Sequence, residues 1–176
     1  MNPRRLTDAR ILAAASSVAL FAGSACAQAL PTDLSPAHER LRFFEGTWTT
    51  NDATVADAFE EVCAWLPEGR RHMVCRSRWK TGAGPREGLS IFSYDAAAGD
   101  YIYSGFRSGG LHVMQRGREH NGGWVFQSER GHGPDRVRSR VTIEPHNEGF
   151  RLLMETATER ESWREQSRVS YRRVTR

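Results

Sequence analysis

The chain has little lysine and little cysteine, and it has no hydrophobic run long enough to cross a membrane. Lys80 is the only lysine, so arginine carries nearly all of the positive charge, and cysteine occurs 3 times in 176 residues. The most apolar stretch, residues 11–23, is shorter than the roughly 20 residues that a membrane-spanning helix needs. The net charge of +4 is small, and no basic run is interleaved with aromatic residues. We therefore expect neither a membrane span nor a nucleic-acid partner.

Recognisable catalytic and metal-binding motifs are also missing from the sequence. The 6 histidines are scattered, with no H-x-H or H-x-x-x-H spacing of the kind that holds zinc. Glycine runs such as Gly122-Gly123 are typical of hairpin turns, because none of them follows a strand and opens a helix as a phosphate-binding loop does. No G-x-S-x-G nucleophile elbow occurs. The sequence therefore predicts no catalytic residue, no metal site and no cofactor.

The first 27 residues have the pattern of a secretory signal peptide. Three arginines precede the apolar stretch, and residues 25–27 read A-C-A, which fits an A-x-A cleavage site. A lipoprotein anchor at Cys26 and twin-arginine export are weaker alternatives, because the neighbouring residues depart from both signals. We expect residues 1–27 to be removed and residues 28–176 to form one domain in the periplasm or outside the cell. Because the leader carries two net positive charges, its loss lowers the net charge from +4 to about +2.

The segment from Phe59 to Trp79 predicts a β-hairpin, and the symmetry of its sequence supports this prediction. When positions are paired symmetrically about Gly69, compatible residues meet. The predicted cross-strand pairs are Phe59 with Trp79, Glu61 with Ser77, Cys63 with Cys75, and Trp65 with Met73. Because side chains alternate between the two faces of a strand, all eight of these side chains share one face.

Cys63 and Cys75 are the two cysteines that remain once the leader is removed. We expect a disulfide between them, since they form an even pair in an oxidising compartment and the hairpin places them opposite each other. A redox-active pair is the alternative, but the sequence lacks the C-x-x-C spacing typical of such pairs. The sequence therefore favours a structural disulfide.

Strand-like runs make up most of the remaining chain. Ser35 and Pro36 predict a short helix that ends by Gly46. A strand from Trp48 follows, and turn signals then separate further expected strands at about 55–66, 71–80, 87–94, 101–107, 111–117, 123–129, 136–144, 149–156 and 163–174. The short links leave no room for parallel crossovers, so we expect an antiparallel meander of eight to ten strands.

Alternating hydrophobicity indicates that this meander has an inside. Val141 and Ile143 alternate with Arg140 and Thr142, and the same period continues through Phe150, Leu152 and Met154. Closing into a barrel is the simplest way for such a meander to remove its exposed edges. The predicted fold class is therefore all-β, a closed antiparallel up-and-down β-barrel with a short N-terminal helix. A two-layer sandwich is the alternative.

Several motifs give the chain a family resemblance. The short helix that runs into Gly46-x-Trp48, followed by the meander, resembles the calycin superfamily of lipocalins and fatty-acid-binding proteins. Residues 63–69 with Val74-Cys75, and the later tyrosine and glycine pattern of residues 93–110, are similar to a bacterial family of secreted lipocalin-like domains of unknown function. The likeness runs from about residue 34 to 174.

The resemblance implies a structural role for the G-x-W tryptophan. In lipocalins this side chain closes the barrel floor beneath an arginine from the last strand, which implies Trp48 here, with Arg172 or Arg173 as its cation–π partner. The chain departs from the family pattern in two respects. It has no T-D-Y motif, and no histidine aligns with the haem ligand of nitrobindin-like barrels.

The function predicted from these observations is binding of a small hydrophobic molecule inside the barrel. The candidate cavity-lining residues are Phe59, Glu61, Trp65, Met73, Ser77, Trp79, Tyr103 and Trp124. Packing of these aromatic residues as a plain core is the alternative. The sequence does not decide which face of the strands carrying Tyr101, Tyr103, Trp124 and Phe126 points inward.

Glu61 is the most informative of the candidates, because burial on the hairpin face would raise its pKa and make it a ligand anchor or a proton donor. The alternatives are a pairing arginine that neutralises it, or a position at a wet mouth. Two other functions stay open at this point: a periplasmic enzyme with a second acid or base beside Glu61, and a packed barrel that recognises a protein partner through an exposed apolar patch.

Overall fold

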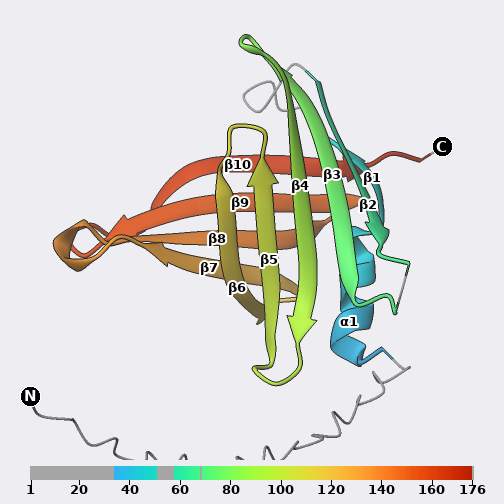
Figure 1. The fold of residues 1–176 in the computed structure, drawn as a ribbon, viewed down its shortest axis with the longest axis horizontal. Coiled ribbons are helices and arrows are strands. Elements are labelled where there is room, and N and C mark those ends of the chain that lie inside the picture. The colour runs from blue at the N-terminus through green and yellow to red at the C-terminus, as the bar shows by residue number, and fades with distance from the viewer. Residues whose placement is uncertain (1–33, 51–57, 68, 176) are drawn as a thin grey trace, which may run out of the picture. The chain divides into compact units, whose positions relative to one another are not determined.

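A computed structural model describes residues 34–50, 58–67 and 69–175 (Figure 1). The expected signal peptide, residues 1–27, and the first residues of the strand expected from 55 lie outside this described part. The helix α1 (Pro36–Arg40) is followed by a single 3₁₀ turn, η1 (Leu41–Phe44). The strands are β1 (Gly46–Thr49), β2 (Ala58–Trp65), β3 (His72–Thr81), β4 (Gly84–Asp95), β5 (Asp100–Arg107), β6 (His112–His120), β7 (Gly123–Arg130), β8 (Val137–His146), β9 (Gly149–Thr158) and β10 (Arg164–Arg173), with a short 3₁₀ turn, η2 (Gly133–Asp135), between β7 and β8.

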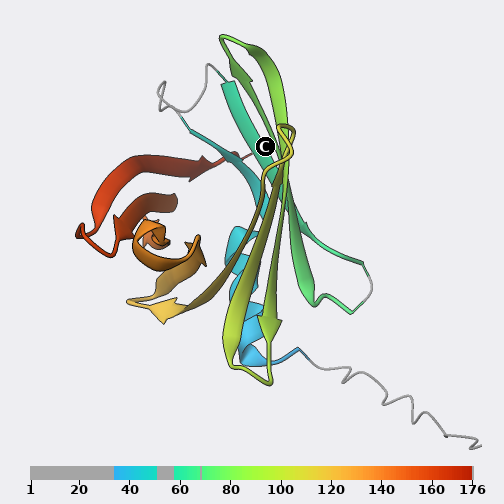
Figure 2. The ribbon, with the colours of Figure 1, turned by 60° about the vertical axis from the view of Figure 1, so that its left-hand side comes forward.

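The ten strands form one closed antiparallel barrel, so the predicted fold class is confirmed and the sandwich alternative is discarded (Figures 1 and 2). Each strand pairs with its neighbour in the chain, and β1 closes the circle by pairing with both β2 and β10. Turn residues define the links as expected; for example, Asn121 adopts a positive φ of 49° between β6 and β7. The up-and-down order follows from these short links.

The hairpin of β2 and β3 has the register that the sequence predicts. Glu61 pairs with Ser77, Cys63 with Cys75, and the two flanking pairs follow in the same register. The turn is made by Gly69, with a φ of 72°, and Arg70, with a φ of 46°. Cys63 and Cys75 form the expected disulfide, and both are buried.

The N-terminal helix α1 begins as predicted and continues into the 3₁₀ turn η1. The hydroxyl of Ser35 accepts a hydrogen bond from the backbone N–H of His38, which caps α1. In η1, Phe44 is almost fully buried and stacks on Phe92 of β4 at a centroid distance of 4.4 Å. Phe44 also contacts Trp124 of β7. Because β4 and β7 lie on different sides of the barrel, η1 fills part of the barrel interior.

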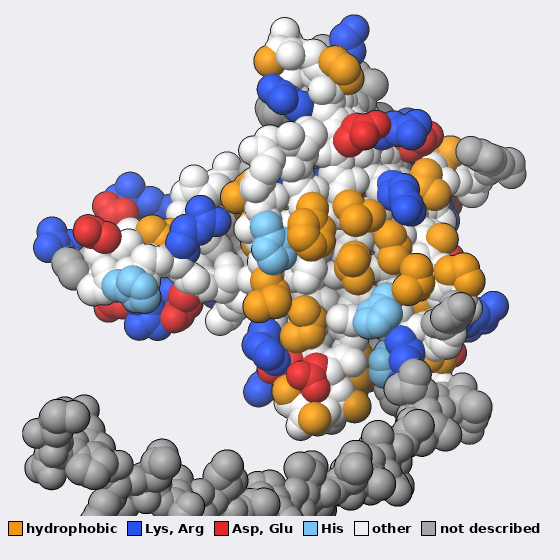
Figure 3. All heavy atoms as spheres, in the orientation of Figure 1, with side chains coloured by type: hydrophobic (Ala, Val, Ile, Leu, Met, Phe, Trp, Pro, Cys, Tyr) orange, Lys and Arg blue, Asp and Glu red, His pale blue; other side chains and the backbone are white. Residues whose placement is uncertain are grey.

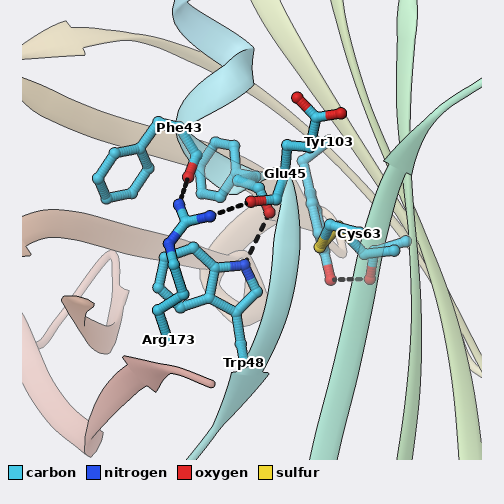
Figure 4. Close-up of a disulfide and its surroundings, with 9 residues drawn as sticks. Phe43, Glu45, Trp48, Cys63, Tyr103 and Arg173 are labelled. Carbon is cyan, nitrogen blue, oxygen red and sulfur yellow. Dashed lines mark hydrogen bonds between the residues drawn. A yellow bond between two sulfur atoms is a disulfide. The ribbon is translucent and has the colours of Figure 1, made fainter. Parts of the chain in front are cut away.

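Trp48 anchors the strand that closes the barrel. Its indole N–H donates a hydrogen bond of 2.7 Å to the carbonyl of Phe44, and the guanidinium of Arg173 lies 4.4 Å from its ring centroid (Figure 4). Arg173 also donates to the carbonyl oxygens of Phe43 and Glu45. Of the two arginines that the resemblance implied, Arg173 is therefore the one that lies over the ring of Trp48. The cause is the register, which pairs Trp48 with Arg173 and sets Arg172 opposite Thr49.

We expect loss of the disulfide to destabilise the barrel without changing its fold. A Cys63→Ala/Cys75→Ala variant should lower the free energy of unfolding by about 3 kcal/mol, because the bridge closes a short loop and so restricts the unfolded chain. Urea denaturation of the variant and of the oxidised wild type measures the difference. An equal midpoint and slope for the two proteins would contradict a stabilising bridge.

Candidate functional site

A cavity of about 330 Å³ lies among the inward-facing side chains of the barrel. Phe59, Glu61 and Tyr103, three of the residues predicted to line it, do so. The apolar wall is completed by residues from η1 and from both halves of the barrel: Phe44, Phe92, Leu111, Val113, Phe126, Val141, Ile143, Phe150, Leu152, Met154 and Tyr171. This volume is at the lower end of the range typical of small-molecule sites.

The other predicted residues do not border this cavity. Met73, Ser77 and Trp124 are buried, and each has at most 1% of its surface exposed. Trp65 is half-buried and packs against the core. The ring of Trp79, also half-buried, has the guanidinium of Arg107 5.5 Å from its centroid. In these positions the side chains fill the space around the cavity.

The structure also decides which faces of β5 and β7 point inward. Tyr101, Trp124 and Phe126 belong to the buried core, and Tyr103 packs against it. Opposite Phe126 the chain has Gly117, where an added Cβ would lie 2.5 Å from the phenyl ring. The apolar lining residues of β8 and β9 follow the alternation seen in the sequence, which was the signal available for finding them. Arg140 and Glu155 also line the cavity but depart from this alternation.

The polar part of the site is a row of four residues on four neighbouring strands. Glu61 of β2 pairs with Ser77 of β3, Ser77 with Gly88 of β4, and Gly88 with Arg107 of β5. A Cβ on Gly88 would lie 2.7 Å from both the Ser77 hydroxyl oxygen and an Arg107 nitrogen. The missing side chain of Gly88 therefore leaves the space that the Arg107 side chain occupies. We call these four residues the polar row.

Burial raises the pKa of the Glu61 carboxyl to about 7, and the charge of Arg107 offsets this effect only in part. Glu61 is half-buried and lines the cavity, so it is accessible to a molecule bound there. Beside it, the Ser77 hydroxyl is buried and has no hydrogen-bond partner among the described residues. A buried hydroxyl without a partner is uncommon in folded proteins.

Glu61 also lies close to the two cysteines, with a carboxylate oxygen and both sulfur atoms within 4.8 Å of one another. Three such groups would suit a soft metal ion if the sulfurs were thiolates. Because the sulfurs are bonded to each other, they are not available as thiolate ligands in the oxidised protein. Figure 4 shows the disulfide beside Tyr103, whose hydroxyl lies 3.2 Å from that of Ser90.

Exposed residues line the cavity on the side where the pairing of β6 and β7 ends. Their pairing stops at Arg116 and Gln127, and beyond that point the side-chain amide of Gln115 bridges to the Ser128 hydroxyl at 3.4 Å. Leu111, with 48% of its surface exposed, lines the cavity on this side together with the exposed Arg130. Arg140 and Glu155, also in the lining, form an ion pair of 2.8 Å.

A second feature of the surface is an apolar area on the outer face of β3, β4 and β5, visible in Figure 3 as a group of hydrophobic side chains. Cross-strand pairs such as Val74 with Ile91 and Leu89 with Phe106 build it, and Met114 of β6 is exposed nearby. This area is the kind of feature expected of a protein-interaction surface.

Comparison with known proteins leaves the family open. No protein-family model matches the chain, and no curated protein is similar enough in sequence to count as a relative. Within the described residues, no helix combines the length and hydrophobicity needed to cross a membrane. The function is therefore argued from the site itself.

Ionisation of Glu61 should make the stability of the protein depend on pH. Between about pH 4.5 and 7 the folded protein holds a proton that the unfolded chain releases, so the free energy of unfolding should fall as the pH rises through this interval. A shift of this size corresponds to at most about 3 kcal/mol. Glu61→Gln should remove this fall, as measured by urea denaturation at pH 5 and pH 8.

The matched control is Glu60→Gln, since Glu60 is the exposed neighbour on the same strand. It should keep the pH dependence of the wild type. If Glu61→Gln also kept the wild-type difference between pH 5 and pH 8, Glu61 would not be the group responsible.

Proposed function

We propose that the protein is an exported, lipocalin-like carrier that binds one small, largely apolar molecule inside its barrel, with Glu61 as the polar anchor. The observation that carries this proposal is the cavity of about 330 Å³, whose wall is largely aromatic and aliphatic and is lined by the half-buried carboxyl group of Glu61. Small-molecule sites typically combine these two properties. Export is supported by the leader pattern of residues 1–27 and by the disulfide.

The wall of the cavity is suited to apolar ligands. Phe59, Phe92 and Phe126 contribute rings from three strands, and Leu152 adds an aliphatic surface from β9. Burying apolar area against such a wall gains roughly 25 cal/mol for each Å² removed from water. A ligand that fills the cavity therefore gains affinity mainly from contact with these side chains.

Binding is favoured over catalysis by the way in which the other charged groups are used. An enzyme acting on the ligand would need a second acid or base beside Glu61. The other carboxylate in the described lining, that of Glu155, is held by Arg140 at 2.8 Å. The hydroxyl of Tyr103, another titratable group in the lining, is within hydrogen-bond distance of the Ser90 hydroxyl and is therefore also engaged by the protein. We therefore propose a carrier.

The proposal predicts that filling the cavity abolishes binding. Leu152→Trp places a larger side chain in the lining and should weaken binding of an apolar fluorescent probe such as N-phenyl-1-naphthylamine at least tenfold. Leu153→Trp is the matched control, because Leu153 is the next residue on β9 and does not line the cavity. Fluorescence titration of the three proteins measures the dissociation constants.

Equal affinities of the wild type and Leu152→Trp would mean that the probe binds elsewhere, and loss of binding in Leu153→Trp alone would point to the outer surface. Native mass spectrometry of protein purified from its own periplasm complements the titration. A mass increment that is released on denaturation and missing in Leu152→Trp would identify the natural ligand.

A further inference from the structure

The polar row contains more hydrogen-bonding capacity than the protein uses. The Ser77 hydroxyl has no partner among the described residues, and Arg107 forms no ion pair with any of them. Glu61, which lines the cavity, is within ion-pair distance of no described arginine. The registers thus place a carboxyl, a hydroxyl and a guanidinium group in one row, in which the exposed Arg107 reaches across Gly88 toward Ser77 and no ion pair joins two of these described residues.

The charges that line the cavity decide which ligand head group fits there. The titratable groups facing it are Glu61 from β2, Tyr103 and Arg107 from β5, Arg130 from β7, Arg140 from β8, Glu155 from β9 and Tyr171 from β10. Arg140 and Glu155 neutralise each other. Arg107 and Arg130 form no ion pair with a described residue, so a protonated Glu61 leaves the lining with an excess of positive charge.

Building on the proposed function, we propose that the ligand is an amphiphile with a single carboxylate, which binds at the polar row between Arg107 and a protonated Glu61. One carboxylate oxygen accepts the Glu61 proton in a hydrogen bond, and the guanidinium of Arg107 donates to the other. Charge-assisted hydrogen bonds of both kinds are among the strongest in proteins. The buried Ser77 hydroxyl lies next to Arg107 but outside the cavity lining, so the two contacts of the carboxylate are with Glu61 and Arg107.

Other head groups fit the polar row less well. An ammonium group would be repelled by Arg107, and only an ionised Glu61 could supply its counter-charge, whereas burial opposes the ionisation of Glu61. An alcohol would leave the guanidinium without a counter-charge. A carboxylate satisfies the acid and the cation together, provided that Glu61 keeps its proton.

This arrangement couples ligand binding to proton uptake. Above about pH 7 the free protein has lost the Glu61 proton, and a bound carboxylate would then meet a second negative charge. Binding must therefore take up a proton in this range. By linkage, affinity should fall toward tenfold for each further pH unit.

The test compares decanoate, decanol and decylamine as probes for the full mature protein, by isothermal titration calorimetry between pH 6 and pH 9. Decanoate should bind at least tenfold more tightly than decanol at pH 6 and should lose this advantage by pH 9. At pH 8, titrations in buffers with different ionisation enthalpies should show uptake of about one proton for each decanoate bound. Decanol should bind with little dependence on pH.

Two variants assign the effect to the polar row. Glu61→Gln should bind decanoate without proton uptake, because the amide N–H replaces the acid proton at every pH. Arg107→Gln should weaken decanoate at least tenfold and leave decanol within about twofold. Glu60→Gln, on the outer face of the same strand, should behave as the wild type does.

The outcomes separate this inference from the proposed function. Equal affinity for decanol and decanoate, or proton uptake that persists in Glu61→Gln, would overturn the carboxylate inference while leaving the carrier intact. Tighter binding of decylamine than of decanoate would mean that the site prefers a positively charged head group, and this would overturn the carboxylate inference as well. If none of the three probes bound, and Leu152→Trp changed nothing for the fluorescent probe, both proposals would fall.

Discussion

The structure depends on the closure of the barrel through β1, a strand of only four residues. β1 pairs with β10 through Trp48 and Thr49, and with β2 over its whole length. Without this strand β2 and β10 would be open edges, and their unpaired backbone groups would need other partners. So short a ladder contributes few backbone hydrogen bonds. The side chains around Trp48 supply the remaining stabilisation of the seam, through Arg173 above the ring and the Phe44 carbonyl at the indole N–H.

The shape of the cavity inside the barrel then depends on where large and small side chains alternate around the closed wall. Many inward positions carry aromatic rings, and a barrel filled by large side chains alone would leave no cavity. Glycines at inward positions change this balance locally. Gly105 accommodates the ring of Tyr103, Gly117 that of Phe126, and Gly88 the side chain of Arg107. The space that remains lies between these displaced side chains and the lining of β8 and β9.

The sequence predicts the fold well because the signals for it are local. Turn residues bound each strand, and the symmetry about Gly69 determines one hairpin register with its disulfide. The site was predicted less completely. Glu61 was found because it lies on that hairpin face, whereas Arg107 was missed because its position depends on two further registers, β3 with β4 and β4 with β5. The inward face of β5 was ambiguous because the outer surface there is also apolar, as at Ile102 and Phe106.

The neighbour-by-neighbour order of the strands has a consequence for how the chain reaches this structure. Every pairing except one joins segments that follow each other in sequence, so hairpins can form in any order with little loss of chain entropy. The exception joins Trp48 to Arg173 across almost the whole domain. Contacts of such large sequence separation form slowly. Without the pairing of β1 with β10 the wall would be open along one side, so the cavity is enclosed only when the two ends of the domain meet.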